Sequence, residues 1–236
     1  MRYVFLDLDN TLTDKKATVS AYAEYFFAEY NDSLNPDVSK EYLKEAFNGL
    51  DRGGYETHEV RSQLISELGI WKCTVSADEL SKHWQSWVPK NSLPMIGLYQ
   101  CLTELIEMSF KLCLVSNGQS KNQREKIKKL ALDEYFEKIV ISEEVGFKNP
   151  DIQIFQKALC KMGCNADEAF FVGDHPLNDY MGSIEAGLFG IWYEGAHQWP
   201  DDYPKPVSIK TLNELCPLVR NLTIKGKGRE NNAPML

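Results

Sequence analysis

The sequence predicts an α/β protein: a parallel, Rossmann-like sheet with helices on both faces and an inserted helical-bundle cap. Short, continuously apolar runs alternate with amphipathic helical stretches, as in parallel strands buried on both faces. Between the first apolar run and the others, the pattern is helical throughout. The C-terminal KGKGRENNAPML contains too few apolar side chains to pack. We therefore expect a core of residues 1–15 and 91–224, a cap of residues 16–90 and a disordered tail of residues 225–236.

The first expected element is a buried strand over residues 3–8, YVFLDL. The cap follows it. The stretch GLDRGGYE (49–56) contains two adjacent glycines and is expected to be a loop between two cap helices. The expected cap helices cover roughly 17–30, 37–48, 56–68 and 77–87.

Beyond residue 90, strand and helix patterns alternate. Ser92 and Pro94 form a helix start signal, and Gly163 is a C-terminal cap. The helix KNQREKIKKLAL has a basic face, which we interpret as solvated. Strands are expected at 111–118, 138–142, 169–174 and 188–193, with a helix between each of these strands and the next. A short strand and a last helix are expected within PVSIKTLNELCPLV.

The composition narrows the classes of function. The net charge is -8 over 236 residues, which argues against nucleic acid or an anionic membrane as the partner. No apolar stretch approaches the length of a membrane span, and the first one is broken by Asp7 and Asp9, so no signal peptide is expected. None of the six cysteines forms a C-x-x-C pair, which favours reduced thiols in a cytoplasmic protein. The oligomeric state is not indicated.

Polar side chains follow three of the predicted strands. Asp7 and Asp9 come at the end of the first, Ser116 and Asn117 at the end of the second, and Asp174 at the end of the fourth. Ligands of parallel sheets bind outside the carboxyl ends of the strands. We therefore expect these side chains to converge on one edge of the sheet.

A cluster of carboxylates indicates a metal. Residues two apart on an extended backbone point the same way, so Asp7 and Asp9 can face one cavity that Asp174 also reaches. Their mutual repulsion is relieved by a hard divalent cation, and an oxygen-only site suits Mg²⁺. Together with the hydroxyl groups of Thr11 and Ser116 and the amine of Lys148, these residues describe a phosphoryl-transfer site.

Three motifs resemble those of the haloacid dehalogenase (HAD) superfamily, in particular its helical-cap phosphatases and nucleotidases. DLDNTLT resembles the first motif, D-x-D-x-T, and LVSNG resembles the second, an apolar strand ending in Ser or Thr. VGDHPLNDYMGSIEAG resembles the fourth motif, in which G-D is followed by N-D and a helix. The helical block lies where that family inserts its cap.

The resemblance implies roles for individual residues. Asp7 is similar to the nucleophile that forms an aspartyl-phosphate, and Asp9 to the general acid that then acts as base. Phosphate oxygens would be held by Thr11, Ser116 and the backbone amides near Leu8 and Asn117. Mg²⁺ would be bound by Asp7, the Asp9 carbonyl and Asp174, with Asp179 supporting the site directly or through Asn178 or a water molecule.

The third motif departs from the family pattern. The family places Lys immediately before Pro, whereas this sequence reads VGFKNPDIQIF, with Asn149 in that place and Lys148 one residue earlier. Adjacent residues on an extended segment point to opposite sides. Lys148 is nevertheless our candidate for a phosphate-binding cation, because a long side chain can curl back or the loop can bulge.

These features predict an Mg²⁺-dependent phosphatase acting on a small phosphorylated metabolite, a nucleotide or a sugar phosphate. A phosphomutase uses the same chemistry, and Asn149 is compatible with a catalytically weakened metabolite-binding or regulatory protein. A dehalogenase fits less well, because dehalogenases of this fold do not need Asp9. Substrate specificity is expected in the cap, with candidates in Asp51–Tyr55, residues 22–30 and residues 58–61.

Overall fold

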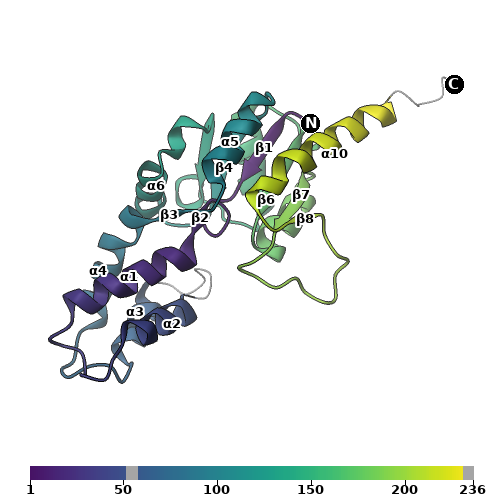
Figure 1. Ribbon diagram of the computed structural model, residues 1–236. Coiled ribbons are helices and arrows are strands. Elements are labelled where there is room, and N and C mark those ends of the chain that lie inside the picture. Colours follow the sequence, from purple (N-terminus) through teal and green to yellow (C-terminus); the bar gives the residue numbers. More distant parts are fainter. Residues whose placement is uncertain (52–57, 231–236) are drawn as a thin grey trace.

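The computed structural model describes residues 1–51 and 58–230. The chain forms two lobes, an α/β core and a smaller helical cap below it (Figure 1). The described part of the cap contains four α-helices, three of which begin at a side-chain cap: Asp14, Ser39 and Ser76 each accept a hydrogen bond from a backbone amide of the first turn. The cap helices are α1 (Lys15–Glu29), α2 (Lys40–Leu50), α3 (His58–Ser66) and α4 (Ala77–Trp87).

The core is built on a six-stranded sheet in the order β5-β4-β1-β6-β7-β8, and every pair of neighbours is parallel. This confirms the predicted α/β class with a parallel sheet. The first strand lies in the middle, so the residues that follow it reach the centre of the sheet edge. The strands are β1 (Tyr3–Leu6), β4 (Lys111–Ser116), β5 (Lys138–Ile141), β6 (Ala169–Gly173), β7 (Phe189–Tyr193) and β8 (Ser208–Ile209).

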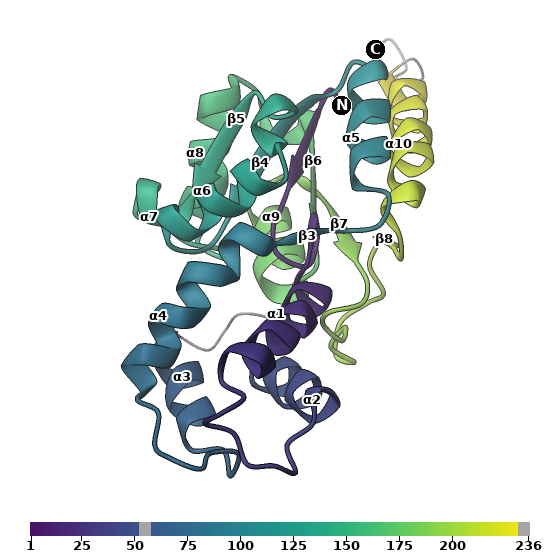
Figure 2. The same ribbon diagram turned by 60° about the vertical axis from the view of Figure 1, so that its left-hand side comes forward.

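Helices cover both faces of this sheet. Val4 and Leu6 pack on one face and Phe5 on the other, because successive strand residues point to opposite sides. The first face is covered by α5 (Leu98–Glu107), α6 (Ser120–Lys129) and α10 (Leu215–Glu230), with α5 beside α10 (Figure 2). The second face is covered mainly by α8 (Ile152–Met162). Shorter helices are η2 (Pro89–Asn91), η3 (Leu132–Glu134), α7 (Ser142–Val145), η4 (Ala166–Glu168), α9 (Gly182–Glu185) and η6 (Leu212–Glu214).

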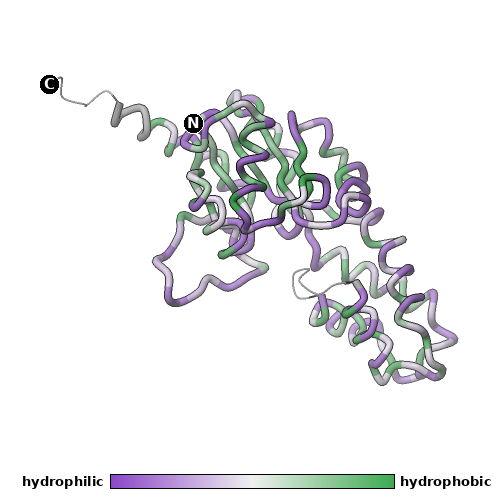
Figure 3. The backbone as a smooth tube through the Cα atoms, turned by 180° about the vertical axis from the view of Figure 1, so that it is seen from behind, coloured by the Kyte–Doolittle hydropathy of each residue, from purple (hydrophilic) through white to green (hydrophobic). Residues whose placement is uncertain are grey.

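The cap has a hydrophobic core of its own. Tyr22, Phe26 and Phe47 are buried together, and the Tyr22 ring meets the edge of Trp84 with a centroid distance of 4.7 Å. Hydrophobic segments lie inside each lobe in Figure 3, and hydrophilic ones lie on the outer loops. Because each lobe buries its own apolar side chains, the space between them is left for polar residues.

Two short antiparallel strands join the lobes. β2 (Thr13–Asp14) pairs with β3 (Leu93–Pro94), so the chain enters and leaves the cap side by side. The described cap helices lie between residues 15 and 87. The division of the chain into a cap of residues 16–90 and a core of residues 1–15 and 91–224 stays a prediction.

Three elements differ from the expected ones. The helix start predicted at Ser92 and Pro94 was wrong, because Pro94 lies in β3 and α5 begins at Leu98. The helix after β6 begins with the π-helical turn η5 (Pro176–Met181), in which the Tyr180 amide donates to the carbonyl of His175. The last helix, α10, continues to Glu230, six residues into the stretch expected to be a disordered tail, and the rest of that tail, 231–236, lies outside the described residues. Within the described part of the chain, no helix has the length and apolar character needed to cross a membrane.

Candidate active site

The carboxyl ends of β1, β4 and β6 open into a cavity of about 630 Å³ between core and cap. The sequence predicted that polar residues after these strands converge, and seven of the eight predicted site residues line this cavity. The eighth, Thr11, is fully buried outside the cavity lining, and its hydroxyl has no hydrogen-bond partner among the described residues. The seven are Asp7, Asp9, Ser116, Asn117, Lys148, Asp174 and Asp179.

Asp7, Asp174 and Asp179 form a cluster of buried carboxylates, whose nearest oxygens all lie within 4.8 Å of one another. Burial, followed by the charges of Asp179, Asp174 and Asp9, raises the pKa of Asp7 well above its ordinary value. Burial and then the charge of Asp174 raise the pKa of Asp179 to about 7. Three crowded oxygen donors that are costly to ionise together fit a hard divalent cation such as Mg²⁺.

The start of the helix after β6 brings Asp179 into this cluster. His175 caps that turn: its Nδ1 accepts from the amides of Leu177 and Asn178, and its own amide donates to Asp179 Oδ2 at 3.0 Å. Gly173 provides the space, because a Cβ atom there would lie 2.5 Å from the Cβ of Asp179. Glycine is therefore required at position 173, in the G-D pair of the fourth motif, because any larger residue would displace Asp179.

Asn149 belongs to the carboxylate cluster. Its Nδ2 donates to Asp179 Oδ1 at 2.9 Å, its backbone amide donates to Asn117 Oδ1 at 2.8 Å, and the Asn117 Nδ2 donates to the Asn149 carbonyl at 3.1 Å. Asn149 is 4% exposed, whereas Lys148 is exposed and lines the cavity. Within the described residues Lys148 makes no ion pair, so its ammonium group can turn toward a ligand.

Helix α6 supplies two site residues that the sequence analysis missed. Lys126 Nζ lies 2.7 and 2.6 Å from the two carboxylate oxygens of Asp9, and Gln123 Nε2 lies 3.0 Å from one of them and 2.7 Å from Ser116 Oγ. The interpretation of the basic face of this helix as solvated was therefore wrong at Lys126. The sequence did contain a signal for these two residues: α6 directly follows a strand that ends in the predicted site residues Ser116 and Asn117.

The ion pair determines the charge of Asp9. Burial alone would raise the pKa of this carboxyl, but the charges of Lys126 and Lys15 and the hydrogen bonds from Lys126 and Gln123 hold its pKa well below the ordinary value. Asp9 is therefore a carboxylate in this arrangement, the form that can accept a proton from water.

A third missed residue is His197, in the segment between β7 and β8. Its Nδ1 lies 2.9 Å from Asp174 Oδ2, and the Asp174 carbonyl accepts a hydrogen bond from Trp192 Nε1 at 2.7 Å. The histidines looked scattered in the sequence, yet His175 and His197 meet here with ring centroids 4.6 Å apart. His197 follows a strand whose carboxyl end lies on the same sheet edge, and this was the available signal.

The cap contributes the opposite wall of the cavity. Arg61 NH2 lies 2.6 Å from Asp51 Oδ1, Lys15 Nζ lies 3.1 Å from Asp51 Oδ2, and the guanidinium of Arg61 stacks 4.4 Å from the ring centroid of Trp84. Of the predicted specificity candidates, Asp51, Glu59 and Arg61 line the cavity. Residues 22–30 are absent from its described lining, and the rest of the candidate loop, 52–55, lies outside the described residues.

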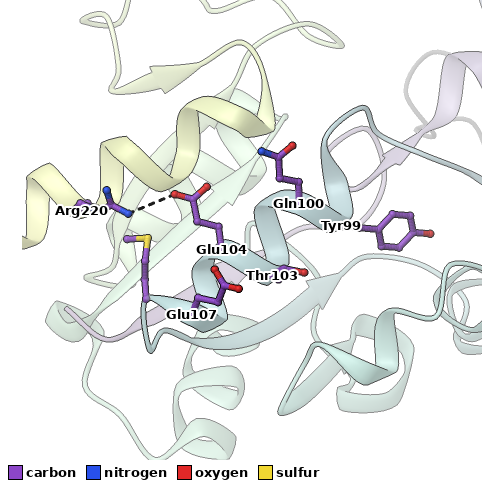
Figure 4. Close-up of a pocket in the computed structure, with 7 residues that line it drawn as sticks. Tyr99, Gln100, Thr103, Glu104, Glu107 and Arg220 are labelled. Carbon is purple, nitrogen blue, oxygen red and sulfur yellow. Dashed lines mark hydrogen bonds and ion pairs between the residues drawn. The ribbon is translucent and has the colours of Figure 1, made fainter.

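A second hollow, of about 680 Å³, lies between α5 and α10 (Figure 4). Its side chains are mostly exposed, and its one drawn ion pair joins Arg220 and Glu104 at 3.5 Å. Exposed pairs of this kind contribute little to binding or stability. The hollow has no convergent cluster of catalytic groups, so the cavity at the sheet edge is the candidate active site.

A comparison with known protein families places this site in a wider context. The profile of the haloacid dehalogenase-like hydrolases matches residues 4–192. The chain belongs to this family. The match begins in β1 and ends in β7, so it includes every strand end that lines the cavity.

Known members of the HAD family resemble the chain over nearly its whole length. The glyceraldehyde 3-phosphate phosphatase of Methanopyrus kandleri is 34% identical over 231 residues, covering 94% of this chain and 98% of that protein. The pyrimidine 5'-nucleotidase YjjG of Escherichia coli is 27% identical over 220 residues, covering 90% and 95%. A magnesium-bound crystal structure of the HAD-hydrolase YfnB from Bacillus subtilis, which reveals interdomain movement in that protein, has a TM-score of 0.71 at 25% identity and covers 93% and 99%.

Proposed function

We propose that this HAD-family protein is an Mg²⁺-dependent phosphatase that hydrolyses a small phosphorylated metabolite, a nucleotide or a sugar phosphate, through an aspartyl-phosphate intermediate. One observation carries the proposal: three carboxylates suited to a metal lie in the same cavity as a fourth carboxylate, Asp9, and the polar groups of Ser116 and Asn117. Relatives named as phosphatases and a nucleotidase support the same reaction class.

In the first step, an oxygen of the Asp7 carboxylate attacks phosphorus and the ester bond to the leaving group breaks. Asp9, which is a carboxylate in the free site, must first take up a proton from solvent, and it then gives this proton to the leaving oxygen. In the second step, water attacks the phosphorus of the aspartyl-phosphate and loses a proton to the Asp9 carboxylate. The bond between phosphorus and Asp7 breaks, and inorganic phosphate leaves.

The remaining predicted residues support this chemistry. We assign the phosphate oxygens to Ser116, Asn117 and Lys148; Thr11, the other predicted phosphate ligand, is buried outside the cavity lining. We assign Mg²⁺ to Asp7, Asp174 and Asp179 together with the Asp9 carbonyl, and the bound ion would offset the charge of the phosphate. The metal ligands are held by groups of this chain: His197 contacts Asp174, and Asn149 contacts Asp179.

The size of the cavity favours a small substrate. Its volume is about 630 Å³, and the cap side chains of Arg61 and Trp84 form part of its lining. These two side chains would contact the part of the substrate away from the phosphate. We place the reaction in the cytoplasm, and the six free cysteines support this assignment.

A screen of phosphorylated metabolites tests the proposal, with an aryl phosphate as a generic substrate. Release of inorganic phosphate is measured with Mg²⁺, and again after the protein has been treated with EDTA. We expect turnover that requires the metal and is restored when Mg²⁺ is added back. Full turnover in the chelator would refute the metal assignment.

A binding-only protein gives a different pattern. It would bind inorganic phosphate or a phosphorylated metabolite in a calorimeter and release no phosphate from any ester. A phosphomutase would convert a sugar phosphate to its isomer faster than it releases phosphate. The same screen therefore separates the three functions.

A further inference from the structure

The cavity contains more negative charge than a phosphate site tolerates by itself. Four carboxylates line it from the core, and the substrate adds a dianion. A divalent cation compensates part of this charge. Position 149, where the family resemblance implies a lysine, holds a neutral amide that is engaged with Asp179. Further positive charge must come from elsewhere in the chain.

Lys126 is held inside the site. Its side chain is 12% exposed, and its ammonium group contacts both oxygens of Asp9, whose side chain is 23% exposed. Lys148 is also in the lining, but it is exposed. An ammonium group fixed by two short contacts has a defined position. An exposed lysine side chain loses conformational entropy when it is ordered against a ligand.

Helix α6 explains why Lys126 is fixed. Gln123 lies three residues before it, so the two side chains lie on the same side of the helix and meet the same carboxylate. Ile127, next in sequence, is buried in the main hydrophobic core and anchors the turn. Gln123 Nε2 also contacts Ser116 Oγ at 2.7 Å, which joins this pair to the end of β4.

We propose that Lys126 is a positioning residue of this active site: it holds the Asp9 carboxylate in the cavity and supplies, from α6, the positive charge that position 149 lacks. The inference rests on the proposed phosphatase function. Lys126 lies beside the group that exchanges protons with the leaving oxygen and with water, so its charge acts where negative charge develops. Its contribution is therefore expected mainly in kcat.

Lys126→Met, Lys126→Arg and Lys128→Met test the proposal. Lys128 is exposed on the same helix, so its substitution removes the same charge away from the cavity. With an aryl phosphate and saturating Mg²⁺, Lys126→Met should lower kcat about a hundredfold, with a smaller change in KM. Lys126→Arg should recover most of the loss, and Lys128→Met should match the parent protein. Equal activity of Lys126→Met and the parent, or no recovery by Lys126→Arg, would overturn the inference.

A binding measurement separates this inference from the proposed function. Orthovanadate resembles the five-coordinate phosphorus of the transition state, and its affinity in the presence of Mg²⁺ can be measured by calorimetry without turnover. Lys126→Met should weaken orthovanadate at least about tenfold and leave the thermal midpoint within a few degrees of the parent. Unchanged orthovanadate affinity would overturn the role of Lys126 even if the parent is a phosphatase. A parent protein that hydrolyses no ester would refute the proposed function, while the loss of affinity would still support Lys126 as the cation of the site.

Discussion

The side-chain amide of Asn149 donates from Nδ2 to Oδ1 of Asp179 at 2.9 Å, and both residues are 4% exposed. An amide directs the carboxylate without neutralising it, because it carries no charge. The repulsion between Asp179 and the carboxylates of Asp174 and Asp7 therefore persists until a cation binds. The stability of the metal-free protein should depend on pH for this reason.

The first prediction concerns that dependence. The pKa of Asp179 rises from 3.8 to about 7, with Asp7, Asp174, His175 and His197 as its charged or titratable neighbours. A carboxyl with a raised pKa stabilises the fold most below pH 4, and this contribution is lost as the pH rises through 7. In EDTA, the thermal midpoint should fall by several degrees between pH 5 and pH 8.

Asp179→Asn is the matched variant, because it removes one titrating group and keeps the shape. Its midpoint should fall less over the same pH range than that of the parent. Adding Mg²⁺ at pH 8 should raise the midpoint of the parent more than that of the variant. Parallel pH profiles of the two proteins would contradict the assignment of this dependence to Asp179.

The second prediction uses the contact between Gly173 and Asp179. A methyl group at Gly173 would meet the Asp179 side chain at 2.5 Å, so Gly173→Ala should displace that carboxylate and destabilise the fold by about 1–3 kcal/mol. The affinity for Mg²⁺, measured by calorimetry, should fall about tenfold or more. Gly69→Ala is the control, since a Cβ at Gly69 has no neighbour within 4 Å. Unchanged Mg²⁺ affinity in Gly173→Ala would show that Asp179 is dispensable for the metal.

The sequence predicted the parts of the site that follow strands. A continuous apolar run indicates a buried parallel strand, and the residue after it lies at the edge where ligands bind. Asp7, Ser116 and Asp174 were found in this way, and the inserted helices were recognised from their period. These features depend on local patterns, which a single sequence contains.

The sequence did not predict contacts made by long side chains across elements. Lys126 is one of several lysines on α6, and only the packing of Ile127 and the placement of the helix against β4 decide which of them enters the cavity. His197 contacts Asp174, a residue 23 positions away, through an irregular segment with no periodic pattern. The turn that brings Asp179 to Gly173 is a π-helical turn, which the helical period of 3.6 residues does not reveal.

The third prediction concerns the nucleophile. Asp7→Asn should reduce phosphate release by a factor of about 1,000 or more, because an amide cannot form an acyl phosphate. Removing one of three crowded charges should also raise the thermal midpoint of the metal-free protein, since the pKa of Asp7 is raised by burial and by Asp179 and Asp174. The two effects have opposite signs, so loss of activity cannot be ascribed to unfolding. Activity near the parent level would mean that another residue attacks phosphorus.

The last prediction compares the two residues of the third motif. Lys148 is exposed at the cavity wall, so its ammonium group can meet an incoming phosphate, and Lys148→Ala should lower kcat/KM for an aryl phosphate about tenfold. Lys157→Ala, an exposed lysine of α8 outside the cavity, is the control. Asn149→Lys should be neutral or harmful, because it brings a second cation beside Lys148 and removes the amide that directs Asp179.

Steady-state kinetics of the three variants on one aryl phosphate test this comparison. If instead Lys148 takes no part and position 149 simply lacks its cation, Lys148→Ala would behave like the parent and Asn149→Lys would be strongly activated. The double variant Lys148→Ala/Asn149→Lys distinguishes crowding of two cations from the absence of a cation at position 149. Its activity should exceed that of Lys148→Ala only if a lysine at position 149 can reach the phosphate. Activation of Asn149→Lys by itself would refute the role assigned to Lys148, since a site that already has its cations gains little from another.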